Sequence, residues 1–125
     1  MKHEADFEIL ALVDPRLYDA VRLAASGING CSLRLDSGQG SLNELAQADQ
    51  VDLVLLDPDA VAINAADGIS MLKAAWPHCE IVLLLGNQDI TVDIELMKIG
   101  AYGAIPKPPS QEDLSKLIRG LMEKN

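Results

Sequence analysis

Residues 52–57 read Asp-Leu-Val-Leu-Leu-Asp, a short apolar run with an acidic residue at each end. Residues 80–85 resemble them, reading Glu-Ile-Val-Leu-Leu-Leu. Continuous apolar runs of this length are typical of strands that are buried on both faces of a parallel sheet. These two segments therefore predict the centre of an α/β domain.

Three further apolar runs, at residues 7–13, 31–35 and 102–105, bring the number of predicted strands to five. A helix-like stretch follows each run, and this alternation favours a parallel sheet with helices on both faces. The most economical fold is a flavodoxin-like, doubly wound sheet of five parallel strands in the order 2-1-3-4-5, with five helices. We expect residues 1–125 to form one domain, either a whole protein or the amino-terminal part of a longer one.

N-capping residues predict where the helices begin. Asp14, followed by proline, can cap a first helix, and residues 41–44 and 110–113 resemble capping boxes for the second and fifth helices. The other two helices are expected over residues 67–76, before a proline, and from about residue 90 to the glycine at position 100.

Composition excludes several function classes. The 19 acidic residues outnumber the 10 basic ones, and a net charge of −9 repels nucleic-acid backbones and anionic lipid, so neither is an expected partner. No apolar run has the length of a signal peptide core or a membrane span, which predicts a cytoplasmic protein. Cys31 and Cys79 fit no metal-ligand spacing, so we expect both to be reduced packing residues.

Three charged residues follow predicted strands: Asp14 after the first, Asp57 after the third and Lys107 after the fifth. In open α/β sheets, ligands bind beyond the carboxyl ends of the strands, where the strand order reverses. Two neighbouring carboxylates need a counter-charge, which Mg²⁺ can supply, and Lys107 could hold the oxygens of a phosphoryl group on Asp57. For Asp14, helix capping is an equally good interpretation.

These strand-end residues, together with Asp67-Gly68, residues 100–104 and Lys107-Pro108, resemble the receiver domain of two-component response regulators. The resemblance extends over nearly the whole chain. It implies that Asp57 accepts a phosphoryl group and that Lys107 contacts the acyl phosphate. It also implies that Asp14, Asp57 and the backbone carbonyl of Asp59 bind Mg²⁺, and that the Lys107-Pro108 peptide bond is cis.

The same resemblance implies the partners. A histidine kinase or phosphotransfer protein would supply the phosphoryl group. A downstream protein or fused output domain would bind the surface of the fourth helix, fifth strand and fifth helix, and a homodimer is compatible with the family. The chain would be a signalling module whose only chemistry is its own phosphorylation and dephosphorylation.

The sequence also departs from the family pattern. Receivers end strand one with two adjacent acids, whereas this chain has Val13 before Asp14, so we expect Mg²⁺ binding to be weak. The switch hydroxyl residue falls on Leu85 and the switch aromatic on Ala104, and neither side chain can act in the usual way. These departures favour an atypical switch. The alternative is a pseudo-receiver that binds partners independently of phosphorylation.

Two weaker alternatives come from other families. Residues 57–61 match the Asp-x-Asp-x-Val motif of haloacid-dehalogenase-type phosphatases, but the motif follows the third strand here and a later acidic pair on a strand end is missing. A flavin domain would need a phosphate loop rich in glycine and hydroxyl residues after the first strand. A cobalamin domain would need a loop histidine, and this chain has neither feature.

Overall fold

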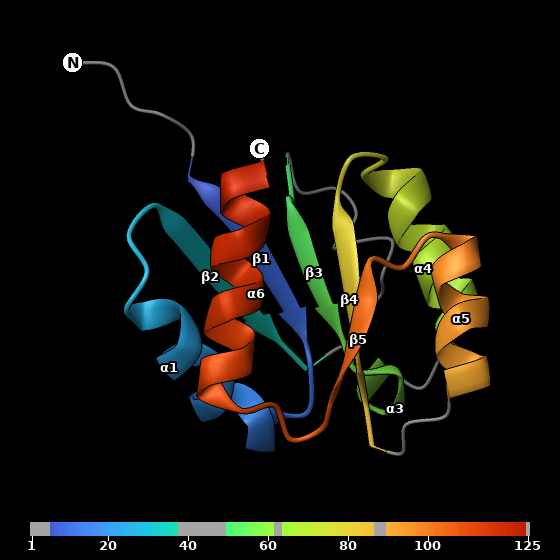
Figure 1. Cartoon of the computed structure of the whole chain (residues 1–125), viewed down its shortest axis with the longest axis horizontal. Coiled ribbons are helices and arrows are strands. Elements are labelled where there is room, and N and C mark those ends of the chain that lie inside the picture. Colours follow the sequence, from blue (N-terminus) through green and yellow to red (C-terminus); the bar gives the residue numbers. More distant parts are fainter. Residues whose placement is uncertain (1–5, 38–49, 62–63, 87–89, 125) are drawn as a thin grey trace.

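The computed structural model describes residues 6–37, 50–61, 64–86 and 90–124. Five parallel strands form one sheet in the order β2-β1-β3-β4-β5 (Figure 1). This is the flavodoxin-like order predicted from the sequence. The strands are β1 (Phe7–Leu12), β2 (Cys31–Asp36), β3 (Leu53–Leu56), β4 (Glu80–Leu85) and β5 (Gly103–Pro106).

Helices connect the strands of the sheet. The elements are the short 3₁₀ helix η1 (Pro15–Leu17), α1 (Tyr18–Ser26), α3 (Pro58–Val61), α4 (Ala65–Ala75), α5 (Ile90–Ile99) and α6 (Gln111–Lys124). The helix expected to begin at residues 41–44 lies outside the described residues. Helix α4 begins two residues earlier than predicted because Asn64 caps it, accepting hydrogen bonds from the backbone N–H groups of Ala66 and Asp67.

The helices pack on the two faces of the sheet (Figure 1). Helices α1 and α6 cover one face, and α4 and α5 cover the other. Side chains of the buried strands alternate between these two cores, as the pleat of a strand requires. In β1 and the residue after it, for example, one core receives Ile9, Ala11 and Val13, and the other receives Leu10 and Leu12.

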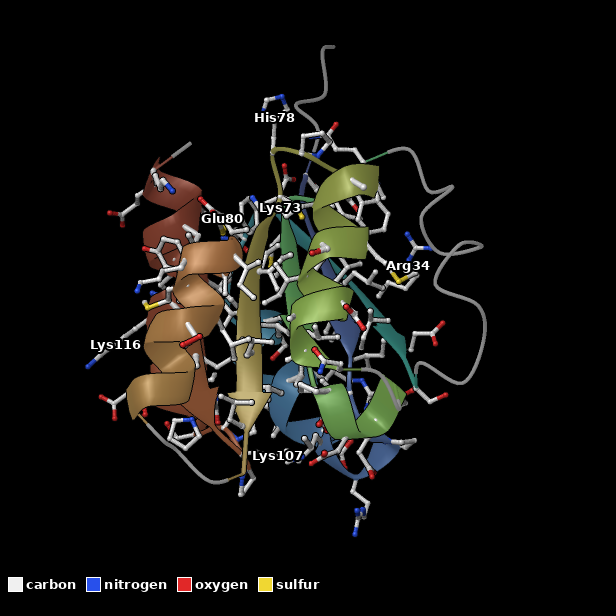
Figure 2. The ribbon with its side chains drawn as sticks, turned by 90° about the vertical axis from the view of Figure 1, so that its right-hand side faces the viewer. Arg34, Lys73, His78, Glu80, Lys107 and Lys116 are labelled. Atoms are coloured by element: carbon white, nitrogen blue, oxygen red, sulfur yellow. The ribbon has the colours of Figure 1, made fainter. Side chains whose placement is uncertain are left out.

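Trp76, Cys79 and His78, which have no predicted function in the site, lie away from the carboxyl ends of the strands. Trp76 and Cys79 are buried in the core beneath α4 and α5, and the packing role expected for Cys79 is confirmed. Both cysteines are free thiols. His78 is exposed at one end of the sheet, and Lys107 lies at the opposite end (Figure 2). In the described part of the chain, no helix is long and apolar enough to cross a bilayer.

Candidate functional site

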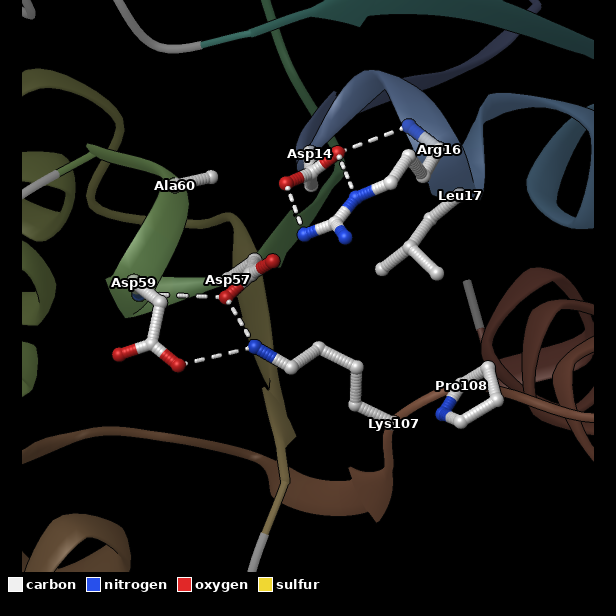
Figure 3. Close-up of a pocket in the computed structure, with 8 residues that line it drawn as sticks. All are labelled: Asp14, Arg16, Leu17, Asp57, Asp59, Ala60, Lys107 and Pro108. Carbon is white, nitrogen blue, oxygen red and sulfur yellow. Dashed lines mark hydrogen bonds and ion pairs between the residues drawn. The ribbon is translucent and has the colours of Figure 1, made fainter.

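The three charged residues singled out at the strand ends line one cleft. The backbone N–H of Asp57 donates to the carbonyl of Leu12 at the end of β1, and that of Lys107 donates to the carbonyl of Leu85 at the end of β4. This pairing places Asp14, Asp57 and Lys107 around a cleft of about 560 Å³ (Figure 3). The predicted juxtaposition beyond the carboxyl ends of the strands is therefore present.

Asp57 is the buried carboxylate of this cleft, with only 1% of its surface exposed. Its Oδ1 accepts hydrogen bonds from Lys107 Nζ at 2.9 Å and from the backbone N–H of Asp59 at 3.1 Å. Its Oδ2 has no hydrogen-bond partner among the described residues and points to the side where Asp14 and Arg16 lie (Figure 3). A buried, unbonded carboxylate oxygen is costly, and in native proteins such atoms have a specific reason.

Lys107 joins two carboxylates. Its Nζ contacts Asp57 Oδ1 at 2.9 Å and Asp59 Oδ2 at 3.0 Å, and its side chain is 21% exposed. Partial burial lowers the pKa of the Lys107 amine, but the hydrogen bonds and charges of the two aspartates raise it further, so the net pKa is raised. Lys107 is therefore held in its charged form. The peptide bond between Lys107 and Pro108 is cis, as the family resemblance implied.

Asp14 lies on the other side of the cleft and forms a two-pronged ion pair with Arg16. Arg16 Nη2 donates to Asp14 Oδ2 at 3.0 Å and Nε to Oδ1 at 3.1 Å. These bonds, together with a third from the Arg16 backbone N–H, lower the pKa of Asp14 to about 2. The third bond caps η1, so the capping role considered for Asp14 is confirmed. Its role in metal binding stays a prediction.

Two features of the cleft were absent from the sequence predictions: the cation at Arg16 and the ion pair of Asp59. Both follow from a repeated local structure. Asp14-Pro15 and Asp57-Pro58 each follow a strand and start a helical turn, and each aspartate accepts a hydrogen bond from the backbone N–H two residues later. An Asp-Pro pair after a buried strand is therefore the sequence signal that could have placed both residues at the start of a helical turn beside the cleft.

The described residues are a poor fit for a tightly held divalent cation. Mg²⁺ requires several free oxygen ligands in near-octahedral geometry. Arg16 already binds both oxygens of the Asp14 carboxylate, and Lys107 binds one oxygen of Asp57 and one of Asp59. Within the described ranges, no group of three or more Asp, Glu, His or Cys side chains is arranged to hold a metal ion.

The two switch positions lie on the neighbouring strands β4 and β5. Leu85 is the last residue of β4 and pairs with Pro106 of β5, and Ala104 pairs with Leu83. Both side chains are partly buried against the core under α4 and α5. The Leu85 side chain therefore has no hydroxyl group to hydrogen-bond a phosphoryl oxygen, and the Ala104 side chain has no aromatic ring.

Comparison with known proteins agrees with this architecture. A five-stranded parallel sheet in this order defines a flavodoxin-like α/β fold, and Asp57 and Lys107 are paired beyond its strand ends. The family model of the response regulator receiver domain matches residues 14–119. The chain therefore belongs to the response regulator receiver domain family.

Solved structures give the same fold. A response regulator from Thermotoga maritima is 18% identical, with a TM-score of 0.81 and coverage of 94% of this chain and 98% of that one. A LuxR family DNA-binding response regulator from Silicibacter pomeroyi is 25% identical, with a TM-score of 0.74 and coverage of 94% and 93%. A streptococcal redox sensor, described as evolved from two-component response regulators, is 26% identical, with a TM-score of 0.75 and coverage of 94% and 51%. The comparison with curated proteins gave no match.

Membership of the family settles the class of activity. Receiver domains are signalling modules of two-component systems and are generally not enzymes. They typically bind Mg²⁺ and interact with kinases and output domains.

Proposed function

We propose that this chain is a receiver that accepts a phosphoryl group on Asp57 from a phosphohistidine of a histidine kinase or phosphotransfer protein. One observation carries the proposal. The carboxylate of Asp57 is buried in the strand-end cleft, holds Lys107 at 2.9 Å and keeps an oxygen that bonds to no described residue. A carboxylate placed in this way has a fixed position and a charged partner ready for the transferred oxygens.

The transfer is a simple displacement. A carboxylate oxygen of Asp57 forms a bond to phosphorus, the bond between phosphorus and the donor imidazole breaks, and the released imidazole nitrogen takes up a proton. The product is an aspartyl phosphate. Its oxygens carry more negative charge than the carboxylate did, and the Lys107 ammonium lies close enough to offset part of that charge.

Lys107 has a second role in this scheme, which is to connect the acceptor with the loop that follows it. Before transfer its ammonium is shared between Asp57 and Asp59. When it moves toward the phosphoryl oxygens, it gives up the contact with Asp59, which is exposed and lies in α3. Loss of that contact changes the surface at α3. This change needs neither a hydroxyl group at position 85 nor an aromatic ring at position 104.

The roles of Asp14, Asp57 and the Asp59 carbonyl in Mg²⁺ binding stay predictions, and no step of the transfer depends on them.

The output surface is proposed to be the one formed by α5, β5 and α6. Met97, Ile99 and Tyr102 are large hydrophobic residues exposed on or beside these elements. Lys124 of α6 lies over the ring of Tyr102, 5.1 Å from its centroid, which links this helix to the segment before β5. Exposed apolar side chains of this kind fit a downstream protein, a fused output domain or a second copy of the chain.

The single-domain organisation and the cytoplasmic location stay predictions.

The experiment is a phosphorylation assay read by intact mass. The protein is incubated with a small phosphodonor such as phosphoramidate, with and without Mg²⁺, beside two variants, Asp57→Asn and Asp59→Asn. Asp59 is the matched control because it is an aspartate of the same cleft that also pairs with Lys107. We expect wild type and Asp59→Asn to gain one phosphoryl group and Asp57→Asn to gain none. Equal uptake by Asp57→Asn would remove the acceptor role of Asp57.

A second candidate function is the pseudo-receiver, a module that binds its partner regardless of phosphorylation. Leu85 and Ala104 favour it, because the side chains that report phosphorylation in the family are replaced. The streptococcal redox sensor, with its origin in response regulators, is a precedent for a changed role on this fold. This candidate predicts no phosphoryl uptake under any condition, together with normal signalling in cells that carry Asp57→Asn.

A further inference from the structure

We propose that the guanidinium of Arg16 takes the place of a divalent cation in the strand-end cleft. In this proposal Arg16 neutralises Asp14, weakens Mg²⁺ binding and joins Lys107 in holding the oxygens of a phosphoryl group on Asp57. The first two statements concern the resting site alone. The third rests on the proposed function.

The charges of the cleft support this assignment. Three carboxylates line it, at Asp14, Asp57 and Asp59, and two cations balance all but one of their charges. A divalent ion would reverse the sign of the whole group, so its electrostatic attraction is reduced compared with a cleft that lacked Arg16.

The position of Arg16 also supports it. The guanidinium lines the same cleft as Asp57 and lies on the side to which the unbonded Oδ2 points (Figure 3). The pKa of Arg16 is raised, chiefly by its hydrogen bond to Asp14, and the charge of Asp57 contributes to the rise. The Arg16 guanidinium and the Asp57 carboxylate therefore share one cleft.

The hydrogen-bonding capacity of Arg16 completes the argument. A guanidinium has five N–H groups in a planar fork that matches carboxylate and phosphate oxygens. The ion pair with Asp14 uses Nε and Nη2, and Nη1 donates to no neighbour among the described residues. The side chain is 88% exposed, so it can turn toward a new anion at little packing cost. Lys107 approaches Asp57 from the opposite side, and the two cations would enclose a phosphoryl group between them (Figure 3).

The first test needs no phosphorylation. Mg²⁺ is titrated into wild type, Arg16→Ala and Arg22→Ala, and binding is followed through the backbone amide NMR signals of Asp57 and Asp59. Arg22 is the matched control, since it is also an exposed arginine paired with an aspartate, at 2.9 Å from Asp19, but outside the cleft. We expect Arg16→Ala to bind Mg²⁺ about tenfold more tightly than wild type, and Arg22→Ala to bind it as wild type does. Unchanged or weaker Mg²⁺ binding by Arg16→Ala overturns the proposal.

The second test compares phosphorylation by phosphoramidate in EDTA and in Mg²⁺. We expect wild type to react in EDTA at a rate within about twofold of that in Mg²⁺, and Arg16→Ala to lose about tenfold or more of its rate in EDTA only. A strict Mg²⁺ requirement in wild type would overturn the proposal for Arg16 and leave the proposed function intact. If no variant takes up a phosphoryl group in either buffer, the proposed function fails, and the Mg²⁺ titration alone decides whether Arg16 excludes the metal.

Discussion

Lys107→Met removes the charged partner of the buried carboxylate while keeping a side chain of similar length. The ion pair between Lys107 and Asp57 is intermediate in burial between two classes of ion pair whose energies are known. Exposed ion pairs contribute about 0.2–1 kcal/mol, and breaking a fully buried pair costs about 3–5 kcal/mol. Asp57 is 1% exposed and Lys107 is 21% exposed, so we place the loss in the free energy of unfolding at about 2 kcal/mol.

The measurement is urea unfolding in EDTA at neutral pH, supported by a thermal melt. At this chain length a loss of about 2 kcal/mol lowers Tm by about 6–10 °C. The control is Lys116→Met, because Lys116 is 74% exposed and pairs with Glu112 at 3.5 Å within α6. We expect this control to change the unfolding free energy by less than about 0.5 kcal/mol.

A double-mutant cycle then attributes the loss to the pair. In an Asp57→Asn background the buried charge is gone, so Lys107→Met should cost less than about 0.5 kcal/mol there. If Lys107→Met is as stable as wild type, or costs the same in both backgrounds, then the Lys107 ammonium does not stabilise the Asp57 carboxylate and the electrostatic reasoning is refuted.

Three further predictions follow from the same site and its surroundings. Arg16→Ala should raise the pKa of Asp14 from about 2 toward 3.8. The backbone N–H of residue 16 still bonds to Asp14 in this variant, so the rise is only partial. In wild type the stabilising pair is complete above pH 3.8 and is lost as the pH falls toward 2, so between these values NMR of the carboxyl carbon should show more protonated Asp14 in the variant than in wild type. Equal midpoints would contradict this. Val13→Asp puts an unpaired carboxylate in the core, so urea unfolding should show a loss of about 3 kcal/mol or more, and wild-type stability would argue against the burial of Val13. Met97→Glu changes an exposed residue and should leave the unfolding free energy within about 0.5 kcal/mol while weakening partner binding or dimerisation, as measured by calorimetry or sedimentation; undiminished association would exclude the proposed surface.

The sequence alone predicted the fold and one part of the site, the pairing of Asp57 with Lys107. The apolar runs at residues 52–57 and 80–85 predicted the central strands because a strand buried on both faces has few alternatives in composition. Asp57 and Lys107 could then be placed together, since parallel strands bring their carboxyl ends to one edge of the sheet. Both predictions depend on the backbone topology alone.

The remaining part of the site, which includes Arg16, depends on the conformations of individual side chains and of short local segments. The exposed side chain of Arg16 could face solvent or the cleft, and only the structure shows that it binds Asp14. No helix was predicted between Asp57 and residue 67. In the structure Pro58 is the first residue of α3, directly after Asp57. The helical turn was therefore predicted after Asp14-Pro15 but missed after Asp57-Pro58.

The most direct test of the account is chemical trapping of the aspartyl phosphate. An acyl phosphate is reduced by borohydride to an alcohol, so an aspartate that carries a phosphoryl group is converted to homoserine. After incubation with phosphoramidate and reduction, peptide mass mapping should find homoserine at position 57 and at no other aspartate of the cleft. Homoserine at position 14 or 59, or its absence from the whole chain, would contradict the claim that Asp57 is the phosphoacceptor.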